Sequence, residues 1–149
     1  MIWGDFDNDG DQDIFAQMGG AYPGDRYHDS LYENPGFGHH WLTVKLVGVE
    51  SNRSAIGSRL RVVAIENGQR RTIYRHVNSG GTFGANPLRQ NIGLGKAQRI
   101  ESLKVFWPKT GKTQKFDDLP VDCSIEIVEG QDRLRIVPLE TLRLGGIEN

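Results

Sequence analysis

Hydrophobic and polar residues alternate with a period of two in several short segments of the chain, the pattern of strands that bury one face. The clearest segment is 41–49, WLTVKLVGV, and similar patterns occupy residues 59–65 and 70–77. Between the last two lies Asn67-Gly68, a pair that favours the tight type I′ turn of a β-hairpin. The pattern therefore predicts one strand at 41–49 and a hairpin over residues 59–77.

The second half of the chain repeats this organisation. Residues 100–107 end at a turn-forming segment, PKTGK, after which residues 113–116 can pair back with them. Residues 124–130 and 133–137 form a last pair of strand candidates. Because short strands follow one another at regular spacing among nineteen glycines, we expect an all-β fold, either a β-sandwich or a barrel-like domain.

Three regions do not follow the alternating pattern. Residues 19–38 are rich in Gly, Pro and Asp, and they indicate a connector with one short strand candidate at SLYEN. Residues 78–98 form a Gly-rich crossing in which we expect backbone positions with positive φ. The tail, residues 139–149, is expected to be a short helix or loosely ordered.

An acidic loop near the amino end carries the most specific chemistry. Residues 3–15, WGDFDNDGDQDIF, place five aspartates on alternating positions with no Lys or Arg among them: Asp5, Asp7, Asp9, Asp11 and Asp13. Ca²⁺ is bound by six to eight oxygen atoms, which a short turning loop supplies from alternating residues. We therefore predict a calcium site in which Gly10 provides the sharp bend.

In the predicted site, Asp5, Asp7 and Asp9 give one oxygen each, Asp11 gives its main-chain carbonyl, and Asp13 binds through both oxygens. Carboxylates about 4 to 5 Å apart repel by roughly 3 to 4 kcal/mol per pair at an effective dielectric near 20, and a divalent cation removes this repulsion. Mg²⁺ is the poorer candidate because it prefers strict octahedral geometry, and the loop holds no thiolate or imidazole for Zn²⁺. The alternative is a solvated acidic turn.

The surroundings of the loop are also predicted from its pattern. Phe6 and Ile14 are expected to point away from the ion into a core, which places the loop between two strands as a calcium-loop β-hairpin. A structural role is expected for the ion, which would fix the junction between the strands.

The charge distribution and the cysteine content exclude several classes of function. The overall net charge is −1, but residues 1–33 hold eight acidic side chains and one basic side chain, so the remaining chain carries +6. These cations are interleaved with apolar residues at strand-like spacing, which indicates a solvated surface and no nucleic-acid site. Cys123 is the only cysteine, which excludes an internal disulfide and a Cys-rich zinc site. No apolar run approaches the about 20 residues of a membrane helix.

Two parts of the sequence resemble known families. The stretches SNRSAIGSRLRV (51–62), IGLG (92–95) and VFWPKTG (105–111) occur together in the order typical of the ASPIC/UnbV domain. The acidic loop followed by LYEN resembles the last repeat of an FG-GAP or VCBS-type β-propeller, in which such loops hold Ca²⁺. The resemblance implies a partial repeat at 1–38, an ASPIC/UnbV-like β domain at 39–138, and a C-terminal tail at 139–149.

The resemblance further implies that the chain is the C-terminal piece of a larger extracellular or periplasmic propeller protein. The first residues, MIWGDFD, show no secretory signal, as an excised fragment would. We expect a non-catalytic, calcium-binding module for recognition or adhesion, whose ligand is a protein or a glycan, and a homodimer formed through the N-terminal segment. The alternative is an accessory, carbohydrate-binding domain of an enzyme whose catalytic part lies elsewhere in the parent protein.

Other candidate sites have simpler readings. His39 and His40 face opposite ways on an extended chain, so they are expected to be structural or surface residues. Arg53 is expected to clamp a carboxylate, inside the protein or on a ligand. Cys123 is expected to be a small buried strand residue.

Four aromatic residues, Trp41, Phe106, Trp107 and Phe116, are interpreted as core, with stacking on sugar rings as the alternative. No nucleophile with a base, phosphate loop or other catalytic motif is found in the sequence.

Overall fold

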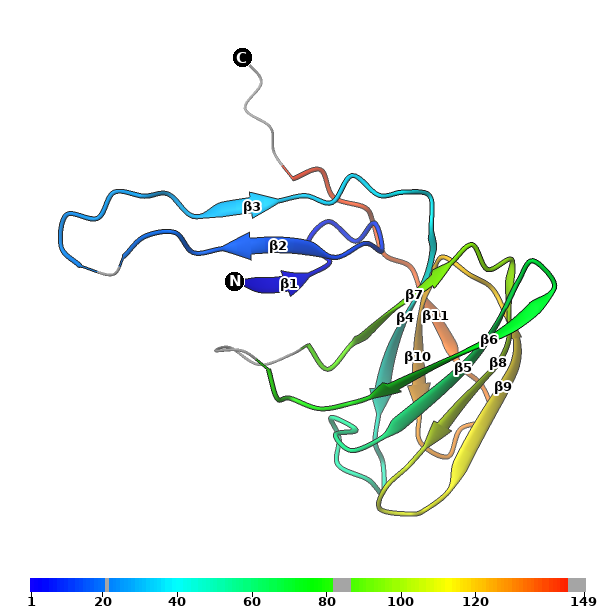
Figure 1. The fold of residues 1–149 in the computed structure, drawn as a ribbon. Coiled ribbons are helices and arrows are strands. Elements are labelled where there is room, and N and C mark those ends of the chain that lie inside the picture. Colours follow the sequence, from blue (N-terminus) through cyan, green and yellow to red (C-terminus); the bar gives the residue numbers. More distant parts are fainter. Residues whose placement is uncertain (21, 82–86, 145–149) are drawn as a thin grey trace. The chain divides into compact units, whose positions relative to one another are not determined.

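The computed structural model describes residues 1–20, 22–81 and 87–144 of the 149-residue chain, and these residues form strands but no helix (Figure 1). The predicted all-β class is thereby confirmed. No described segment is a helix able to cross a lipid bilayer. The chain divides into two compact units: Met1–Phe37 with the segment that starts at Glu140, and Gly38–Leu139.

The first unit contains one small antiparallel sheet in the order β1-β2-β3. Its strands are β1 (Ile2–Gly4), β2 (Asp13–Ala16) and β3 (Ser30–Tyr32). The acidic loop joins β1 to β2, as predicted, and the strand candidate in SLYEN is β3. The prediction that Phe6 enters a core is wrong, because this side chain is 37% exposed, whereas Ile14 is half-buried.

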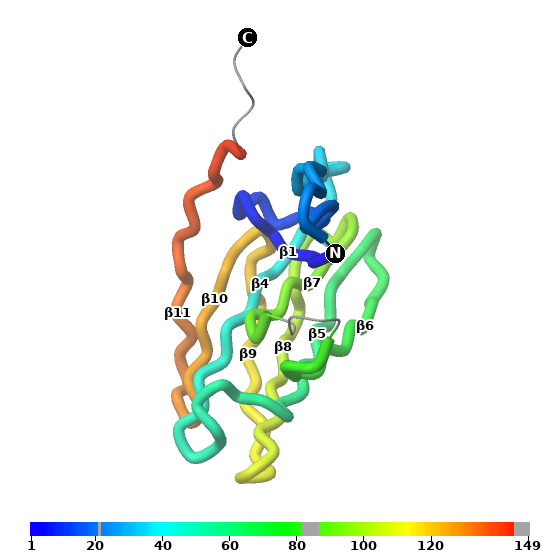
Figure 2. The backbone as a smooth tube through the Cα atoms, turned by 90° about the vertical axis from the view of Figure 1, so that its left-hand side faces the viewer, coloured from blue at the N-terminus to red at the C-terminus, as the bar shows by residue number. Residues whose placement is uncertain are grey.

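The second unit contains eight strands: β4 (His40–Val47), β5 (Arg59–Glu66), β6 (Gln69–His76), β7 (Gln90–Gly95), β8 (Arg99–Phe106), β9 (Thr113–Leu119), β10 (Cys123–Val128) and β11 (Arg135–Val137). They form two four-stranded sheets, one in the order β11-β10-β4-β7 and the other in the order β6-β5-β8-β9. Figure 2 shows the strands of the second unit running along one another, with β11, β10, β4 and β7 following from left to right. This is a β-sandwich without barrel closure in the described chain.

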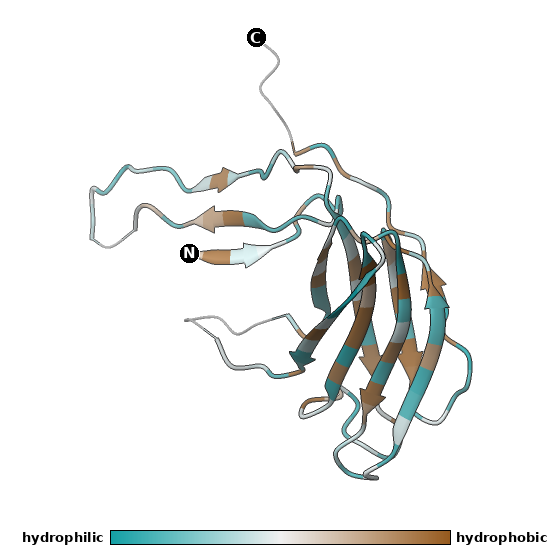
Figure 3. Ribbon diagram, turned by 45° about the vertical axis from the view of Figure 1, so that its right-hand side comes forward, coloured by the Kyte–Doolittle hydropathy of each residue, from teal (hydrophilic) through white to brown (hydrophobic). Residues whose placement is uncertain are grey.

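The alternation read from the sequence becomes the two faces of these sheets. Leu42, Val44 and Leu46 of β4 and Leu60 and Val62 of β5 are buried in one shared core. The residues between them lie on the other faces of the sheets, where Lys45 is exposed but Thr43 is only 1% exposed. The alternating apolar and polar bands of the strands are visible in Figure 3. Burial of such side chains is the main stabilising term of a sandwich, at about 1.5 to 3 kcal/mol for each large apolar side chain.

The predicted β5–β6 hairpin is confirmed in its turn geometry. Asn67 and Gly68 have φ angles of 52° and 74°, the two left-handed residues that a type I′ turn requires. The pairings β8–β9 and β10–β11 are also as predicted. The parallel pairing of β10 with β4 brings the last strands beside the first strand of the unit.

The structure tests the predictions for two of the irregular regions. The segment 78–98 contains strand β7, which pairs with β4 through Leu42 and Ile92. Among its described glycines, Gly95 has a positive φ, of 62°, while residues 82–86 lie outside the described part of the chain. For the tail, residues 139–144 form no helix and no strand, so the short-helix alternative is wrong for this part, and residues 145–149 lie outside the described residues.

Among the four aromatic residues interpreted as core, two are confirmed. Trp107 is fully buried and Phe116 is 7% exposed. Trp41 and Phe106 are half-buried at the sheet surface.

Candidate functional site

The acidic loop turns through two left-handed residues, Asn8 with φ 61° and Gly10 with φ 96°. The main-chain N–H of Asp9 donates to Oδ1 of Asp7 at 3.1 Å, and the N–H of Asp11 donates to Oδ1 of Asp9 at 2.8 Å. Such Asx turns let short acidic side chains fold the backbone that carries them. The spacing of aspartates therefore shapes the loop before any ion is considered.

Three of the five predicted ligands come together. One carboxylate oxygen from each of Asp5, Asp7 and Asp13 lies within 4.8 Å of the other two. These side chains are 9%, 4% and 1% exposed, in that order. We call Asp5, Asp7 and Asp13 the acidic cluster.

Asp13 links the acidic cluster to two other parts of the first unit. Its Oδ2 accepts a hydrogen bond from the N–H of Phe6 at 2.9 Å, and its Oδ1 accepts one from the N–H of Asn34 at 2.9 Å. Asn34 follows β3, so the carboxylate closes the loop against the third strand. The LYEN segment therefore supports the acidic cluster through its backbone.

The acidic cluster is electrostatically unfavourable by itself. Burial raises the pKa of Asp7, and the charges of Asp9 and Asp13 raise it further, while main-chain hydrogen bonds oppose the change. Two unit charges 4.8 Å apart repel by roughly 3 kcal/mol at an effective dielectric near 20. Neither Asp7 nor Asp13 forms an ion pair with a Lys or Arg of the described chain. A divalent cation bound between the carboxylates removes this cost.

The side chains of Asp9 and Asp11 do not join the acidic cluster. Asp9 caps the N–H of Asp11, and Asp11 lies beside Gly36, where an added Cβ would stand 2.9 Å from Oδ2 of Asp11. Both residues therefore contribute to the shape of the loop. Their predicted roles as ligands stay predictions.

A second support for the loop comes from the C-terminal segment of the same unit. The N–H of Leu142 donates to the carbonyl of Asp7 at 2.6 Å, and Nδ2 of Asn8 donates to the carbonyl of Glu140 at 3.2 Å. The sequence does not predict this contact, because Asn8 and Glu140 are 132 positions apart and the tail shows no hydrophobic pattern that indicates a partner.

In the second unit, one residue from each of two resemblance motifs, Ser51 and Thr110, contacts a buried carboxylate, Glu129, which is 7% exposed. Its Oε2 accepts hydrogen bonds from the N–H groups of Val49 at 2.9 Å and Ser51 at 2.7 Å. Its Oε1 accepts from the hydroxyls of Ser51 at 2.9 Å and Thr110 at 3.3 Å. Burial alone would raise the pKa of Glu129, but these four donors lower it below its usual value.

The same end of the sandwich needs glycine at two close approaches. A Cβ on Gly48 would stand 2.1 Å from the carbonyl oxygen of Asn52, and Gly57, with φ 94°, packs against Pro108. Asn52 fixes the loop between them by exchanging hydrogen bonds with the backbone of Ile56. These segments, SNRSAIG and WPKTG, therefore hold the sandwich end together around Glu129.

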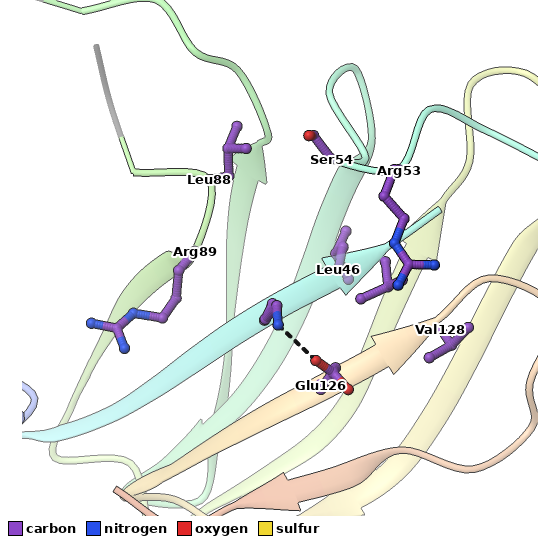
Figure 4. A pocket seen from close by; sticks show the side chains of 9 residues that line it. Leu46, Arg53, Ser54, Leu88, Arg89, Glu126 and Val128 are labelled. Atoms are coloured by element: carbon purple, nitrogen blue, oxygen red, sulfur yellow. Dashed lines mark ion pairs between the residues drawn. The ribbon is translucent and has the colours of Figure 1, made fainter. Parts of the chain in front are cut away.

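Arg53 does not form the expected internal clamp, because no carboxylate in the described chain pairs with its guanidinium group. It lines a pocket of about 410 Å³ with Leu88, Arg89 and Val128, beside the ion pair of Lys45 with Glu126. Figure 4 shows Arg53 and Arg89 extending on different sides of the pocket, so the two guanidinium groups do not converge on one point. A ligand would meet one Arg beside an apolar wall.

The two histidines and the cysteine have structural surroundings. Nδ1 of His40 lies 2.6 Å from Oδ2 of Asp122, and His39 is exposed. Cys123 is half-buried on β10, where burial and then the charge of Asp122 raise the pKa of its thiol. A raised pKa leaves the thiol protonated at neutral pH, which makes it a poor nucleophile.

Comparison with protein families places the second unit. The family model described as ASPIC and UnbV matches residues 48–134, more than half of the chain. The matched range contains the SNRSAIG, IGLG and VFWPKTG segments and Glu129. No curated protein shows significant similarity to the chain.

Proposed function

We propose, from the premise that the chain belongs to the ASPIC and UnbV family, that it is a calcium-binding, non-catalytic module for recognition or adhesion. We further propose that it forms the C-terminal part of a larger extracellular or periplasmic protein. Its two units have different tasks in this proposal. The first unit holds the ion, and the second unit supplies the binding surface.

The acidic cluster is the observation that carries the proposal. Three carboxylates with oxygens within 4.8 Å of one another are almost completely removed from water. Buried charges need a partner of opposite charge, since taking an ionised carboxylate out of water is costly. A bound cation meets this need. The pKa of Asp7 is raised by burial and then by the neighbouring negative charges, which is the cost that a cation would offset.

The donor set favours calcium. All three side chains offer hard carboxylate oxygens, while no sulfur or imidazole belongs to the cluster. Main-chain carbonyls and water can complete the six to eight oxygens that Ca²⁺ takes in its flexible coordination shell. Sites with affinities of about 0.1 to 1 mM suit the calcium concentration outside cells, which agrees with the proposed location.

The first unit also supports an origin in a propeller repeat. Its three strands form a small sheet, and large apolar side chains on it are exposed, among them Trp3 at 57% and Tyr32 at 55%. A repeat unit buries such side chains against neighbouring repeats. We infer that residues 1–38 are the end of an FG-GAP or VCBS-type repeat, and that in isolation this sheet pairs with a second copy of the chain.

A non-catalytic role agrees with the use of the motif residues. Glu129, Ser51 and Thr110 complete one another's hydrogen bonds inside the sandwich end. Groups engaged in this way stabilise the fold, and they are not presented to a substrate.

Calcium titration by isothermal calorimetry tests the proposal. The chain should bind one Ca²⁺ with a Kd of about 0.1 to 1 mM, and Asp13→Asn should weaken binding at least tenfold because it removes charge from the most buried ligand. Glu33→Gln is the matched control, since it removes an exposed acid of the same unit and should leave the affinity unchanged. Absence of binding at 10 mM Ca²⁺, or equal losses in both variants, would contradict the proposal.

A further inference from the structure

The outer face of the sheet β6-β5-β8-β9 carries a transverse row of cations. Arg61 pairs in register with Lys104, and Lys104 with Lys115, so three basic residues lie side by side on three neighbouring strands. Tyr74 pairs with Arg61 from the other side and ends the row with a ring that is 67% exposed. We call Arg61, Lys104 and Lys115 the basic row.

The strand register fixes the direction of these side chains. The residues that flank them in sequence belong to the core between the sheets: Leu60, Val62, Leu103, Val105 and Phe116. Because successive side chains of a strand point to opposite faces, the basic row faces outward. The interleaving of basic and apolar residues in the sequence indicated scattered, solvated cations. The register of the paired strands brings three of these cations side by side.

Like charges directly opposite each other on neighbouring strands destabilise a sheet. Their Cβ atoms are about 4.5 to 5.5 Å apart, so Arg61 and Lys104 form a repulsive neighbour pair, whereas Lys115, the third member of the row, also has Asp117 as an acidic partner. The arrangement resembles the acidic cluster with the sign reversed. In both cases a ligand of opposite charge relieves a cost that the fold bears alone.

Most other cations of this sheet have an acidic partner. Arg70 pairs with Glu101 at 2.7 Å, and Arg99 pairs with Asp118 at 2.8 Å. Lys115 shares its charge with Asp117 at 2.7 Å. Arg61 and Lys104, in contrast, form no ion pair within the described chain.

The neighbouring row adds another cation without an acidic partner. The guanidinium carbon of Arg59 lies 5.9 Å from the centre of the Phe106 ring, and Arg59 and Phe106 are paired in register. Positive charge is therefore concentrated over the Arg59–Arg61 end of β5 and the facing half of β8, while the opposite half of the sheet is neutralised.

We propose that the basic row binds an acidic polysaccharide, through carboxylate or sulfate groups spaced along the chain of the ligand. This inference rests on the recognition role proposed above and names its ligand class and surface. A flat sheet face with cations at strand spacing can follow a thin, extended polyanion, and Tyr74 offers an open ring beside the cations for a sugar face.

A nucleic acid fits this face less well. Single-stranded binding uses several aromatic rings on which successive bases stack. Here Tyr74 is open, but the Phe106 ring lies under the Arg59 guanidinium group. The major groove of a duplex admits a helix or a two-stranded ribbon, whereas the basic row crosses neighbouring strands of a four-stranded sheet.

Binding to heparin and to polygalacturonate, measured by calorimetry in EDTA at 150 mM NaCl, tests the proposal. The chain should bind at least one of these probes, and Arg61→Gln/Lys104→Gln should weaken that binding at least tenfold. Arg61→Lys/Lys104→Arg should retain it. Arg70→Gln/Arg99→Gln is the matched control, because it removes the same charge from the neutralised half of the sheet and should change affinity less than threefold.

The outcomes separate this inference from the calcium proposal. Asp13→Asn should bind the polysaccharide with the affinity of the parent chain. Failure of the calcium proposal would therefore not affect the proposal for the basic row. The inference is overturned if neither probe binds, or if single-stranded DNA binds more tightly than both polysaccharides. It is also overturned if Arg61→Gln/Lys104→Gln and Arg70→Gln/Arg99→Gln lose affinity equally. A melting temperature well below that of the parent chain in Arg61→Gln/Lys104→Gln would also overturn it, since removal of repulsion should not destabilise the sheet.

Discussion

Glu129 in the second unit and Asp7 in the first unit are both nearly inaccessible to water, yet their surroundings differ in kind. Glu129 accepts hydrogen bonds from two main-chain N–H groups and two hydroxyls, and its pKa is lowered. Asp7 lies within 4.8 Å of two further carboxylates, and its pKa is raised, first by burial and then by neighbouring negative charge.

The difference in hydrogen-bond donors and neighbouring charge indicates a different role for each carboxylate. The charge of Glu129 is satisfied by its own chain, so this side chain completes the fold. The charges of the acidic cluster repel one another, and the fold holds them together in spite of this cost. A buried carboxylate with donors is therefore a structural element, whereas buried carboxylates that face one another are the feature on which the proposed cation site rests.

The largest expected effect comes from removing the satisfied carboxylate. Glu129→Ala removes the acceptor of the buried N–H group of Ser51 and of the partly buried N–H group of Val49. Loss of charged hydrogen bonds of this kind should cost about 3 kcal/mol in the free energy of unfolding. Urea unfolding followed by tryptophan fluorescence, to which the buried Trp107 contributes, measures this change.

Glu126→Gln is the control for that measurement. Glu126 lies on β10, three residues before Glu129, and forms ion pairs with Lys45 and Arg135, whose side chains are 60% and 68% exposed. Ion pairs of this exposure contribute about 0.5 kcal/mol. If Glu129→Ala were no more destabilised than Glu126→Gln, Glu129 would not have the structural role described above.

A smaller loss is expected when Glu129 is protonated. Because its pKa is lowered in the folded state, its contribution is fully present above the unfolded pKa, about 4.3, and is lost as the pH falls through the folded value. The loss should be about 2 kcal/mol, since neutral hydrogen bonds are roughly half as strong as charge-assisted ones.

The check is the difference in unfolding free energy between the parent chain and Glu129→Gln across pH 7 to 3. This difference should shrink as the pH falls, because the Gln side chain has no charge to lose. A difference that stays constant with pH would mean that the negative charge of Glu129 contributes nothing to stability.

Much of the fold was predictable because most strands bury one face and expose the other. The segments 41–49 and 59–65 correspond to β4 and β5 within one or two residues at each end. Strand β7 was not predicted, because Gly93 and Gly95 in the IGLG segment are typical of loops. What makes it a strand is its pairing with β4, which local sequence does not reveal.

The acidic cluster was predictable in part, and Glu129 was not. Alternating aspartates on a turning loop indicate a cation site from sequence alone. Which of them come together, Asp5, Asp7 and Asp13, depends on how the loop closes against β3. The main-chain donors to Glu129, on Ser51 and Val49, lie 78 and 80 positions away along the chain, and only tertiary structure brings them to it.

The smallest effect concerns the acidic cluster, and it is local. With a Kd of about 0.1 mM, 1 mM Ca²⁺ should stabilise the first unit by about 1.4 kcal/mol, because binding to the folded state alone adds RT ln(1 + [L]/Kd). Hydrogen exchange of main-chain amides in β1 and β2 should slow about tenfold, and exchange in β8 should not change. Asp13→Asn should abolish the slowing. Equal slowing in both units, or slowing that persists in Asp13→Asn, would mean that the ion binds outside the acidic cluster. The acidic cluster would then not differ from Glu129 in requiring a cation.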